Sequence, residues 1–290
     1  MKTILITGAT AGIGRHAALE LVRKGHHVIA TGRREAALVT LAKEASGLAG
    51  RLDVAVMDVT DESSIRRVAE RALELTDGRG IDVLVNNAGY GQMGPLEEVT
   101  DAELRKQYDT NVFGLMNVTR AFLAQLRSRG ESRIVNVGSI GGRVTFPLMG
   151  AYNSTKYAVE SLSDALRVEL EPFGIRVSLV EPGPIRTEFN DRAMETIDHG
   201  KLESSPYAPV VAQAERFRAK FESQSAGPEV TTRAIVHAAL GRRPRVRYVV
   251  PFSASLLLSL LGTLPTRLVD AIFRAVAGLD KKKLALRAAG

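Results

Sequence analysis

Short apolar segments alternate with longer helical patterns through residues 1–180, and this alternation constrains the fold most strongly. The segments are rich in Val and Ile and show no polar/apolar alternation, as expected for strands buried on both faces. They are Ile4–Thr7, Val28–Thr31, Val54–Met57, Val83–Asn86, Ile134–Val137 and Val177–Val180. The helical stretches between them are Arg15–Lys24, Glu35–Ala45, Asp61–Leu75, Asp101–Arg127 and Tyr152–Glu171. This order predicts an α/β fold with helices on both faces of a doubly wound parallel sheet.

A chain of 290 residues is long enough for one large domain, and no internal repeat or low-complexity linker divides it. We predict one domain over residues 1–250, completed by a helix at Glu229–Leu240 and a strand at Arg245–Val250. The polar, weakly periodic segment at about residues 187–228 is too long for a plain connection, so we expect a substrate lid there.

Residues 251–290 form an apolar tail, in which Ser255–Leu264 is nearly continuous and Thr266–Leu279 has the pattern of an amphipathic helix. Arginines precede this tail, and Lys281–Lys283 follows its second element. An apolar face rimmed by cations is typical of peripheral contact with an anionic membrane. Packing on the same domain, covering the substrate pocket and burial against a second subunit fit the same pattern, and the sequence leaves these alternatives open.

Composition excludes several classes of site. The chain has no Cys, and its His residues form no metal-binding pair, so we expect no metal site. The net charge of +7 suits anionic ligands, but aromatic residues make up only 5% and no recognition motif accompanies the arginines, so we expect no nucleic-acid partner. Because the N-terminus also lacks a secretory pattern, we expect a cytoplasmic protein.

A glycine-rich turn, Thr7–Gly14, follows the first predicted strand and opens the first helix. Glycines allow a tight turn and close approach of the backbone to a pyrophosphate, which the helix N-terminus then attracts. The turn therefore predicts a dinucleotide site with contacts at Gly8, Thr10, Gly12, Ile13 and Gly14.

The second predicted strand leads into Gly32, Arg33 and Arg34, where chains that prefer NAD usually carry an acid for the ribose hydroxyls. A guanidinium binds a 2′-phosphate through a bidentate fork, whereas a carboxylate would repel it. We therefore predict NADP as the cofactor, with Arg33 as the first contact and Arg34 beside it.

Tyr152 and Lys156 are four residues apart, so they share one face of a helix. A free tyrosine, with a pKa of about 10, is a poor acid–base group at neutral pH. We expect the neighbouring ammonium to lower the Tyr152 pKa. This pair gains weight from its order after the glycine turn, Asn86–Gly89, Asn111 and Ser139, all at or beyond the carboxyl ends of strands, where open α/β sheets bind ligands.

Together these motifs resemble the short-chain dehydrogenase/reductase family over about residues 1–190, which implies a Rossmann fold. The resemblance implies a catalytic tetrad of Asn111, Ser139, Tyr152 and Lys156. In this family Ser139 would bind the carbonyl oxygen, Tyr152 would exchange the proton, and Lys156 would also hold the nicotinamide ribose. Asn111 would position a water molecule in a proton relay. Further cofactor contacts implied in the same way are Asp58, Val59, Asn87, Ala88, Gly89, Pro182, Gly183, Ile185 and Thr187.

The chain is most similar to the 17β-hydroxysteroid and retinol dehydrogenase-like branch, through Asn87–Gly91, Thr110–Gly114 and Glu181–Thr187. That resemblance implies NADP(H)-dependent hydride transfer on the carbonyl or alcohol group of a lipophilic substrate that is steroid-, retinoid- or long-chain-like. Two alternatives are a 3-oxoacyl thioester reductase and a non-catalytic NADP-sensing regulator. The family also implies a homo-oligomer formed through the two longest helices. Candidate substrate contacts are Met93, Phe146, Met149, Tyr207 and Phe221.

Overall fold

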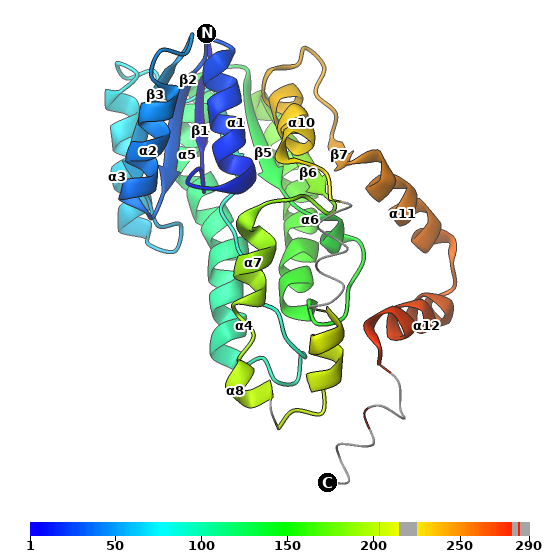
Figure 1. Cartoon of the computed structure of the whole chain (residues 1–290). Helices are drawn as coiled ribbons and strands as arrows, with labels where there is room; N and C mark the ends of the chain where they lie inside the picture. The colour runs from blue at the N-terminus through cyan, green and yellow to red at the C-terminus, as the bar shows by residue number, and fades with distance from the viewer. Residues whose placement is uncertain (203, 215–224, 280–283, 285–290) are drawn as a thin grey trace.

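The computed structural model describes residues 1–202, 204–214, 225–279 and 284. A seven-stranded parallel sheet forms its centre, in the order β3-β2-β1-β4-β5-β6-β7 (Figure 1). The strands are β1 (Thr3–Ile6), β2 (His27–Gly32), β3 (Arg51–Val56), β4 (Val83–Asn86), β5 (Ser132–Val137), β6 (Ile175–Pro182) and β7 (Arg247–Val250). The strand order reverses between β1 and β4, as in a doubly wound Rossmann sheet, so the predicted fold class is confirmed.

Helices cover both faces of the sheet. They are α1 (Gly12–Arg23), α2 (Glu35–Ala45), α3 (Glu62–Glu74), α4 (Asp101–Tyr108), α5 (Gly114–Ser128), α6 (Gly150–Leu170), α7 (Glu188–Met194), α8 (His199–Leu202), α10 (Pro228–Leu240), α11 (Phe252–Thr263) and α12 (Thr266–Ala277). Short turns add η1 (Asp109–Phe113), η2 (Ile140–Gly142) and η3 (Glu171–Phe173).

Two apolar layers explain why the central strands contain few polar residues. Ile4 and Ile6 of β1 belong to the cluster that packs against α1 and α10, whereas Leu5 belongs to the cluster that packs against α3, α5 and α6. Successive side chains of a strand point to opposite faces, so a strand covered on both sides must be apolar at every position. The edge strand β3 is half-buried, so it tolerates polar residues such as Arg51 and Asp53. It therefore begins at Arg51, three residues before the predicted start at Val54.

The predicted helix Asp101–Arg127 is not one regular α-helix. A π-helical turn, η1, separates α4 from α5 and carries Asn111. The described part of the predicted lid segment contains short helices, namely α7, α8 and a helical stretch at residues 208–214. The sequence pattern did not predict these helices, because they are short and polar.

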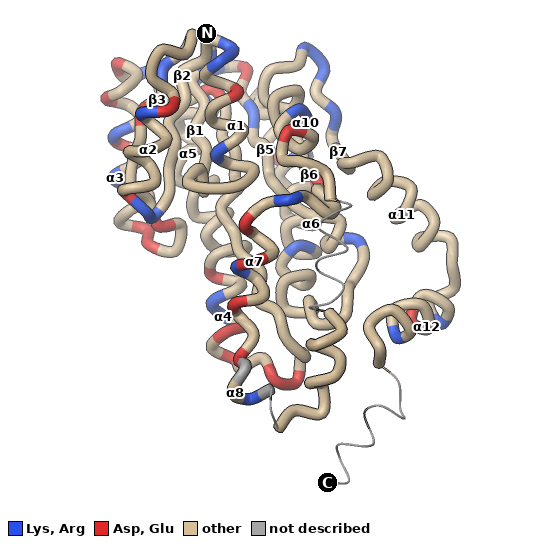
Figure 2. The backbone as a smooth tube through the Cα atoms, in the orientation of Figure 1, with Lys and Arg blue, Asp and Glu red and all other residues tan. Residues whose placement is uncertain are grey.

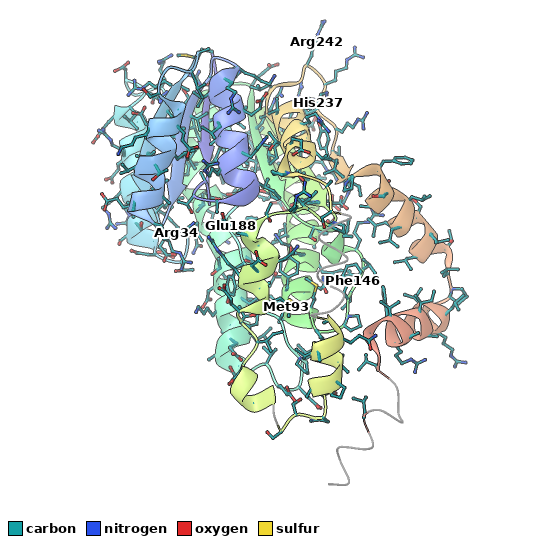
Figure 3. All side chains as sticks on the ribbon, in the orientation of Figure 1. Arg34, Met93, Phe146, Glu188, His237 and Arg242 are labelled. Carbon is teal, nitrogen blue, oxygen red and sulfur yellow. The ribbon has the colours of Figure 1, made fainter. Side chains whose placement is uncertain are left out.

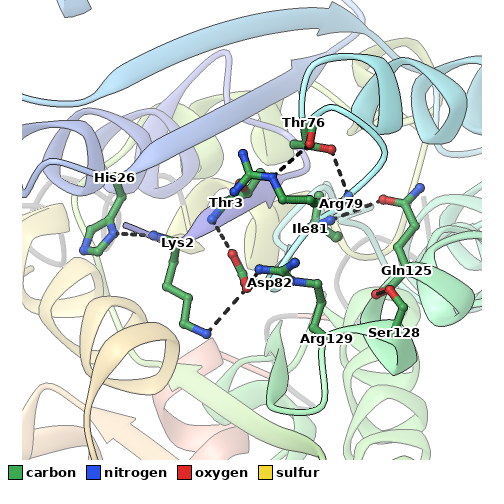
Figure 4. Close-up of polar contacts among 11 residues, drawn as sticks. Lys2, Thr3, His26, Thr76, Arg79, Ile81, Asp82, Gln125, Ser128 and Arg129 are labelled. Carbon is green, nitrogen blue, oxygen red and sulfur yellow. Dashed lines mark hydrogen bonds and ion pairs between the residues drawn. The ribbon is translucent and has the colours of Figure 1, made fainter.

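A buried carboxylate fastens the amino end of the sheet, opposite the carboxyl ends that carry the predicted site (Figure 4). Asp82, which precedes β4, accepts hydrogen bonds from the Thr3 amide at 2.7 Å and from Arg129 Nε at 2.9 Å. Its side chain is only 4% exposed and also lies 3.5 Å from Lys2 Nζ. Asp82 thereby ties β1, β4 and the segment after α5 together.

The tail forms two helices, α11 and α12, which project as an arm from the end of β7 (Figure 1). The amphipathic helix expected in the second half of the tail is present as α12. Among the described residues, no helix is long and apolar enough to cross a membrane.

Candidate active site

The predicted dinucleotide turn lies at the point where the strand order reverses. Gly12 begins α1 with a positive φ of 53°, which favours glycine, and it lies beside Thr187. A side chain at Gly14 would collide with Asn87 and with the Gly8 carbonyl. The first turn of α1 has no acidic residue, and no described side chain caps its N-terminus. Its amide groups and positive dipole are therefore available to an anion.

Asn87 fixes the glycine turn from the neighbouring strand. Its side-chain amide donates to the Thr7 and Gly8 carbonyls at 3.0 and 3.1 Å. The Thr7 hydroxyl accepts from the amides of Asn87 and Ala88, both at 2.9 Å. These bonds join the ends of β1 and β4, so the loop that would face a pyrophosphate is held on both sides.

The end of β2 presents two exposed arginines and no acid. Gly32 packs against Thr10, and Arg34 Nη2 lies 3.4 Å from the Thr10 carbonyl, which brings Arg34 to the glycine turn. Arg33 is exposed beside it. The side chain of Asp58 is bound within its own loop, because it accepts from the Thr60 amide at 2.9 Å. Val59 is buried.

Ser139, Tyr152 and Lys156 converge beyond the end of β5. Ser139 hydrogen-bonds Tyr152, and Lys156 Nζ lies 5.7 Å from the centroid of the Tyr152 ring. Lys156 Nζ also donates to the Val137 carbonyl at 2.9 Å. Tyr152 and Lys156 lie on one face of α6, as the four-residue spacing predicts, and their partners come from the end of β5 and the loop after it.

The expectation that Lys156 lowers the Tyr152 pKa is wrong for the protein without cofactor. Burial raises the pKa of Tyr152 to about 12, and the hydrogen bond with Ser139 offsets this only in part. Burial also lowers the pKa of Lys156 to about 8. Removal from water disfavours the charged form of each group, so the phenol keeps its proton at neutral pH.

Asn111 occupies the π turn η1, and its backbone there departs from regular α-helix. Its amide nitrogen donates to the Tyr90 carbonyl at 3.0 Å and to the Thr155 hydroxyl at 3.1 Å. Thr155 precedes Lys156 in α6, so Asn111 reaches the helix that carries Tyr152 and Lys156. The π turn re-aims one side chain within a long helical segment, a common feature of functional sites.

The remaining predicted cofactor contacts follow β6. Pro182 ends the strand, Gly183 bonds to Val250, and Ile185 is buried and pairs with Ala226. Thr187 caps α7 by accepting from the Phe189 amide at 3.3 Å, and it lies beside Gly12. The segment after β6 thus crosses directly in front of the glycine turn.

Phe189 is a site residue that sequence reasoning missed. Its ring centroid lies 5.4 Å from that of Tyr152, so α7 covers the phenol with an apolar side chain. The sequence signal that could have identified it is its position two residues after Thr187, a predicted cofactor contact. This packing contributes to the burial that raises the Tyr152 pKa.

The candidate substrate contacts separate into different regions. Phe146 packs edge-to-face on Phe273 of α12 at 5.6 Å and lies on the side of α12 in Figure 3. Met93 bonds through its amide to Thr196 beyond α7, and Met149 immediately precedes α6. Tyr207 is half-buried in the lid segment. Phe221 lies outside the described residues.

A partly buried ionic cluster behind Lys156 was not predicted. Glu160, one helical turn after Lys156, pairs with Arg247 of β7. Arg247 also binds Glu181 at 3.2 Å and Asp164 at 2.7 Å. Burial raises the pKa of Glu160 to about 7. The acids come from α6 and β6, so only the folded topology assembles this cluster.

Comparison with known proteins adds relatives that span almost the whole chain. Residues 2–198 match the family model described as short chain dehydrogenase. An uncharacterized oxidoreductase, YbbO, of Escherichia coli (strain K12) is 37% identical over 94% of each chain. The NADPH-dependent 3-dehydrocapnine reductase of Ornithobacterium rhinotracheale is 30% identical over 98% of this chain and 99% of its own. Human 17-beta-hydroxysteroid dehydrogenase type 1 is 33% identical over 84% of this chain and 76% of its own.

Solved structures agree with these relatives. A short-chain dehydrogenase from Streptomyces avermitilis superposes with a TM-score of 0.76 and 34% identity, covering 96% of this chain and 98% of its own. The closed form of a serine dehydrogenase complexed with NADP⁺ gives a TM-score of 0.72 and 30% identity, with coverage of 87% and 95%.

Proposed function

The chain belongs to the short-chain dehydrogenase family of oxidoreductases, and on this premise we propose that it transfers a hydride between NADP(H) and the carbonyl or alcohol group of a lipophilic substrate. The observation that carries the proposal is the convergence of Ser139, Tyr152 and Lys156 at the sheet edge where α1 opens toward an anion.

The residues at this edge fit a nicotinamide dinucleotide. Gly12 and Gly14 form a surface without side chains at the uncapped N-terminus of α1, which suits a pyrophosphate. Asn87 and Thr187 flank the same turn, and the segments that contain them would also hold the cofactor. When bound, the reduced nicotinamide supplies the hydride.

In the proposed mechanism, Tyr152 acts as the acid in carbonyl reduction. Because burial keeps its proton in place at neutral pH, the phenol can donate to the oxygen on which negative charge develops. The Ser139 hydroxyl stabilises the same oxygen as a hydrogen-bond donor. Lys156 supplies positive charge beside the phenol as the Tyr152 proton leaves. Asn111 holds the α6 segment through Thr155.

NADP preference is supported by the two exposed arginines after β2. Arg33 and Arg34 offer guanidinium groups beside the glycine turn, and Arg34 already approaches Thr10. Arg15, the other cation at this turn, is paired with Glu44. We therefore assign the 2′-phosphate first to Arg33. The NADPH dependence named for one relative points in the same direction.

A lipophilic substrate is supported by the apolar side chain that packs against the phenol. Phe189 covers Tyr152, and the proposed lid of residues 187–228 begins at that point. One relative is named a 17-beta-hydroxysteroid dehydrogenase and another a 3-dehydrocapnine reductase. These names suggest a bulky ketone as the substrate of this chain too.

An NADPH-oxidation screen tests this function. Absorbance at 340 nm is followed with ketones and aldehydes of graded size, and with 3-oxoacyl thioesters as a separate arm. We expect turnover that rises with the apolar bulk of free ketones. Turnover confined to thioesters would favour the thioester reductase, and tight NADPH binding with no turnover on any substrate would favour a sensing role.

We also propose a homo-oligomer through the long helices. These segments carry exposed apolar side chains, namely Phe113 in η1 and Tyr157 and Val168 in α6, which are 55%, 44% and 66% exposed. Such a face is typical of a surface that a second copy covers.

A further inference from the structure

The arm formed by α11 and α12 exposes two regular apolar ridges. On α11 the ridge consists of Phe252, Leu256 and Leu260, which are 82%, 62% and 56% exposed. On α12 it consists of Leu268, Ile272 and Val276, which are 47%, 38% and 51% exposed. Residues four apart lie on one helix face, so each set forms a continuous stripe. We call these two stripes the outer ridges.

The other faces of both helices already pack on the protein. Ala254 and Leu258 of α11 are buried in a cluster with Ile140 and Val144 near η2. On α12, Phe273 packs against Phe146. The outer ridges are therefore additional to the faces that attach the arm, and their exposure leaves a large apolar surface in water.

Positive charge is concentrated in the same part of the chain. Residues 241–290 contain ten Lys and Arg against two acids, a net charge of +8, while the whole chain carries +7. Residues 251–266 contain no charged side chain at all. In Figure 2, α11 is free of charged residues, and basic residues mark α12 and the segment between α10 and β7. The rest of the protein is close to neutral.

We propose that the outer ridges dock the arm on the surface of an anionic lipid bilayer. The ridges lie at the boundary between headgroups and acyl chains, and Arg267 and Arg274 on the polar side of α12 pair with lipid phosphates. A second copy of this chain is a poorer occupant of the ridges, because two arms that each belong to a segment of charge +8 repel each other. Lipid supplies both the apolar layer and the opposite charge.

Docking would also place the entrance to the active site at the lipid surface, an inference that rests on the proposed function. Gln213, in the helical lid stretch at residues 208–214, donates to the Val276 carbonyl of α12 at 2.8 Å. Phe273 contacts Phe146 in the loop that leads into the helix of Tyr152. The arm thus contacts the proposed lid segment and the loop that leads into α6, so a lipophilic ketone dissolved in the bilayer would enter the protein beside these two segments.

Vesicle sedimentation of the full chain, without cofactor or substrate, tests docking independently of turnover. Sucrose-loaded vesicles of phosphatidylcholine with phosphatidylglycerol are compared with phosphatidylcholine alone. We expect the partition coefficient to be about tenfold or more higher on the anionic vesicles. The variant F252S/L256S/L260S should lower it by about tenfold or more, because all three side chains leave the interface. R267Q/R274Q should lower binding to anionic vesicles alone.

The matched control is V39S/V56S/L73S, which removes three exposed apolar side chains from α2, β3 and α3, and it should bind like the wild type. Absence of wild-type binding to either vesicle, or equal binding by F252S/L256S/L260S, would overturn docking. So would a fall in molecular mass of that variant in vesicle-free ultracentrifugation, since the ridges would then be a protomer interface. If the chain binds vesicles but does not oxidise NADPH with any carbonyl substrate tested, docking stands and the proposed function is rejected.

Discussion

The protonation state of Tyr152 decides whether this residue can act as the proposed acid. In the protein without cofactor, burial under Phe189 and beside Lys156 raises the Tyr152 pKa to about 12. The helical spacing of Tyr152 and Lys156 predicted their proximity, but it could not predict the desolvation of both groups, which depends on a side chain from α7. Sequence spacing indicates only how far apart two residues lie along a helix, whereas a pKa depends on all the groups that surround the side chain.

Ultraviolet titration of tyrosine measures this state directly. The difference between the wild type and Tyr152→Phe isolates Tyr152 from the five other tyrosines. We expect no ionisation of Tyr152 below about pH 10 in the cofactor-free protein. A Tyr152 transition near neutral pH would show that Lys156 outweighs burial.

Cofactor choice is also a property of single residues in this account. Arg33→Ala should weaken NADPH binding by about tenfold or more while changing NADH binding little, because only NADPH carries the 2′-phosphate. Dissociation constants from quenching of tyrosine fluorescence provide the measurement, with the exposed Arg66→Ala as control. Equal losses for the two cofactors would contradict the phosphate role.

At the scale of elements, the apolar periodicity predicted the sheet and the helices that cover it, but not the features that depend on several elements at once. The π turn that carries Asn111 is bonded to Tyr90 and Thr155, and neither contact is visible in the local pattern. The cluster around Arg247 likewise exists only because β6, β7 and α6 meet. Motif order located the candidate site, and tertiary contacts determine its electrostatics.

Asp82 is the element-scale contact with the clearest energetic consequence. Asp82→Asn should lower the free energy of unfolding by about 2 kcal/mol, because a buried acceptor of charged hydrogen bonds loses its charge. Urea denaturation checks the value, and the exposed Asp77→Asn serves as the control. A loss no larger than that of the control would mean that Asp82 does not hold β1 and β4 together.

At the scale of the whole molecule, the Arg247 cluster links stability to pH. The folded chain raises the Glu160 pKa from 4.5 to about 7, so it holds this proton more tightly than the unfolded chain does. The contribution of Glu160 to stability is therefore greatest below about pH 4.5 and is lost as the pH rises through about 7. Glu160→Gln should reduce the fall in unfolding free energy between pH 5 and pH 8, and Glu169→Gln, exposed on the same helix, should not. Identical pH profiles for Glu160→Gln and the wild type would contradict this linkage.

Tyr152→Phe, assayed on the best ketone from the screen, shows whether Tyr152 is the acid in an NADPH-dependent carbonyl reduction. We expect a fall in kcat of about a hundredfold or more with a nearly unchanged dissociation constant for NADPH, because only the proton donor is removed. Tyr157→Phe, on the exposed side of the same helix, should retain wild-type turnover. Undiminished turnover by Tyr152→Phe would show that Tyr152 is not the acid.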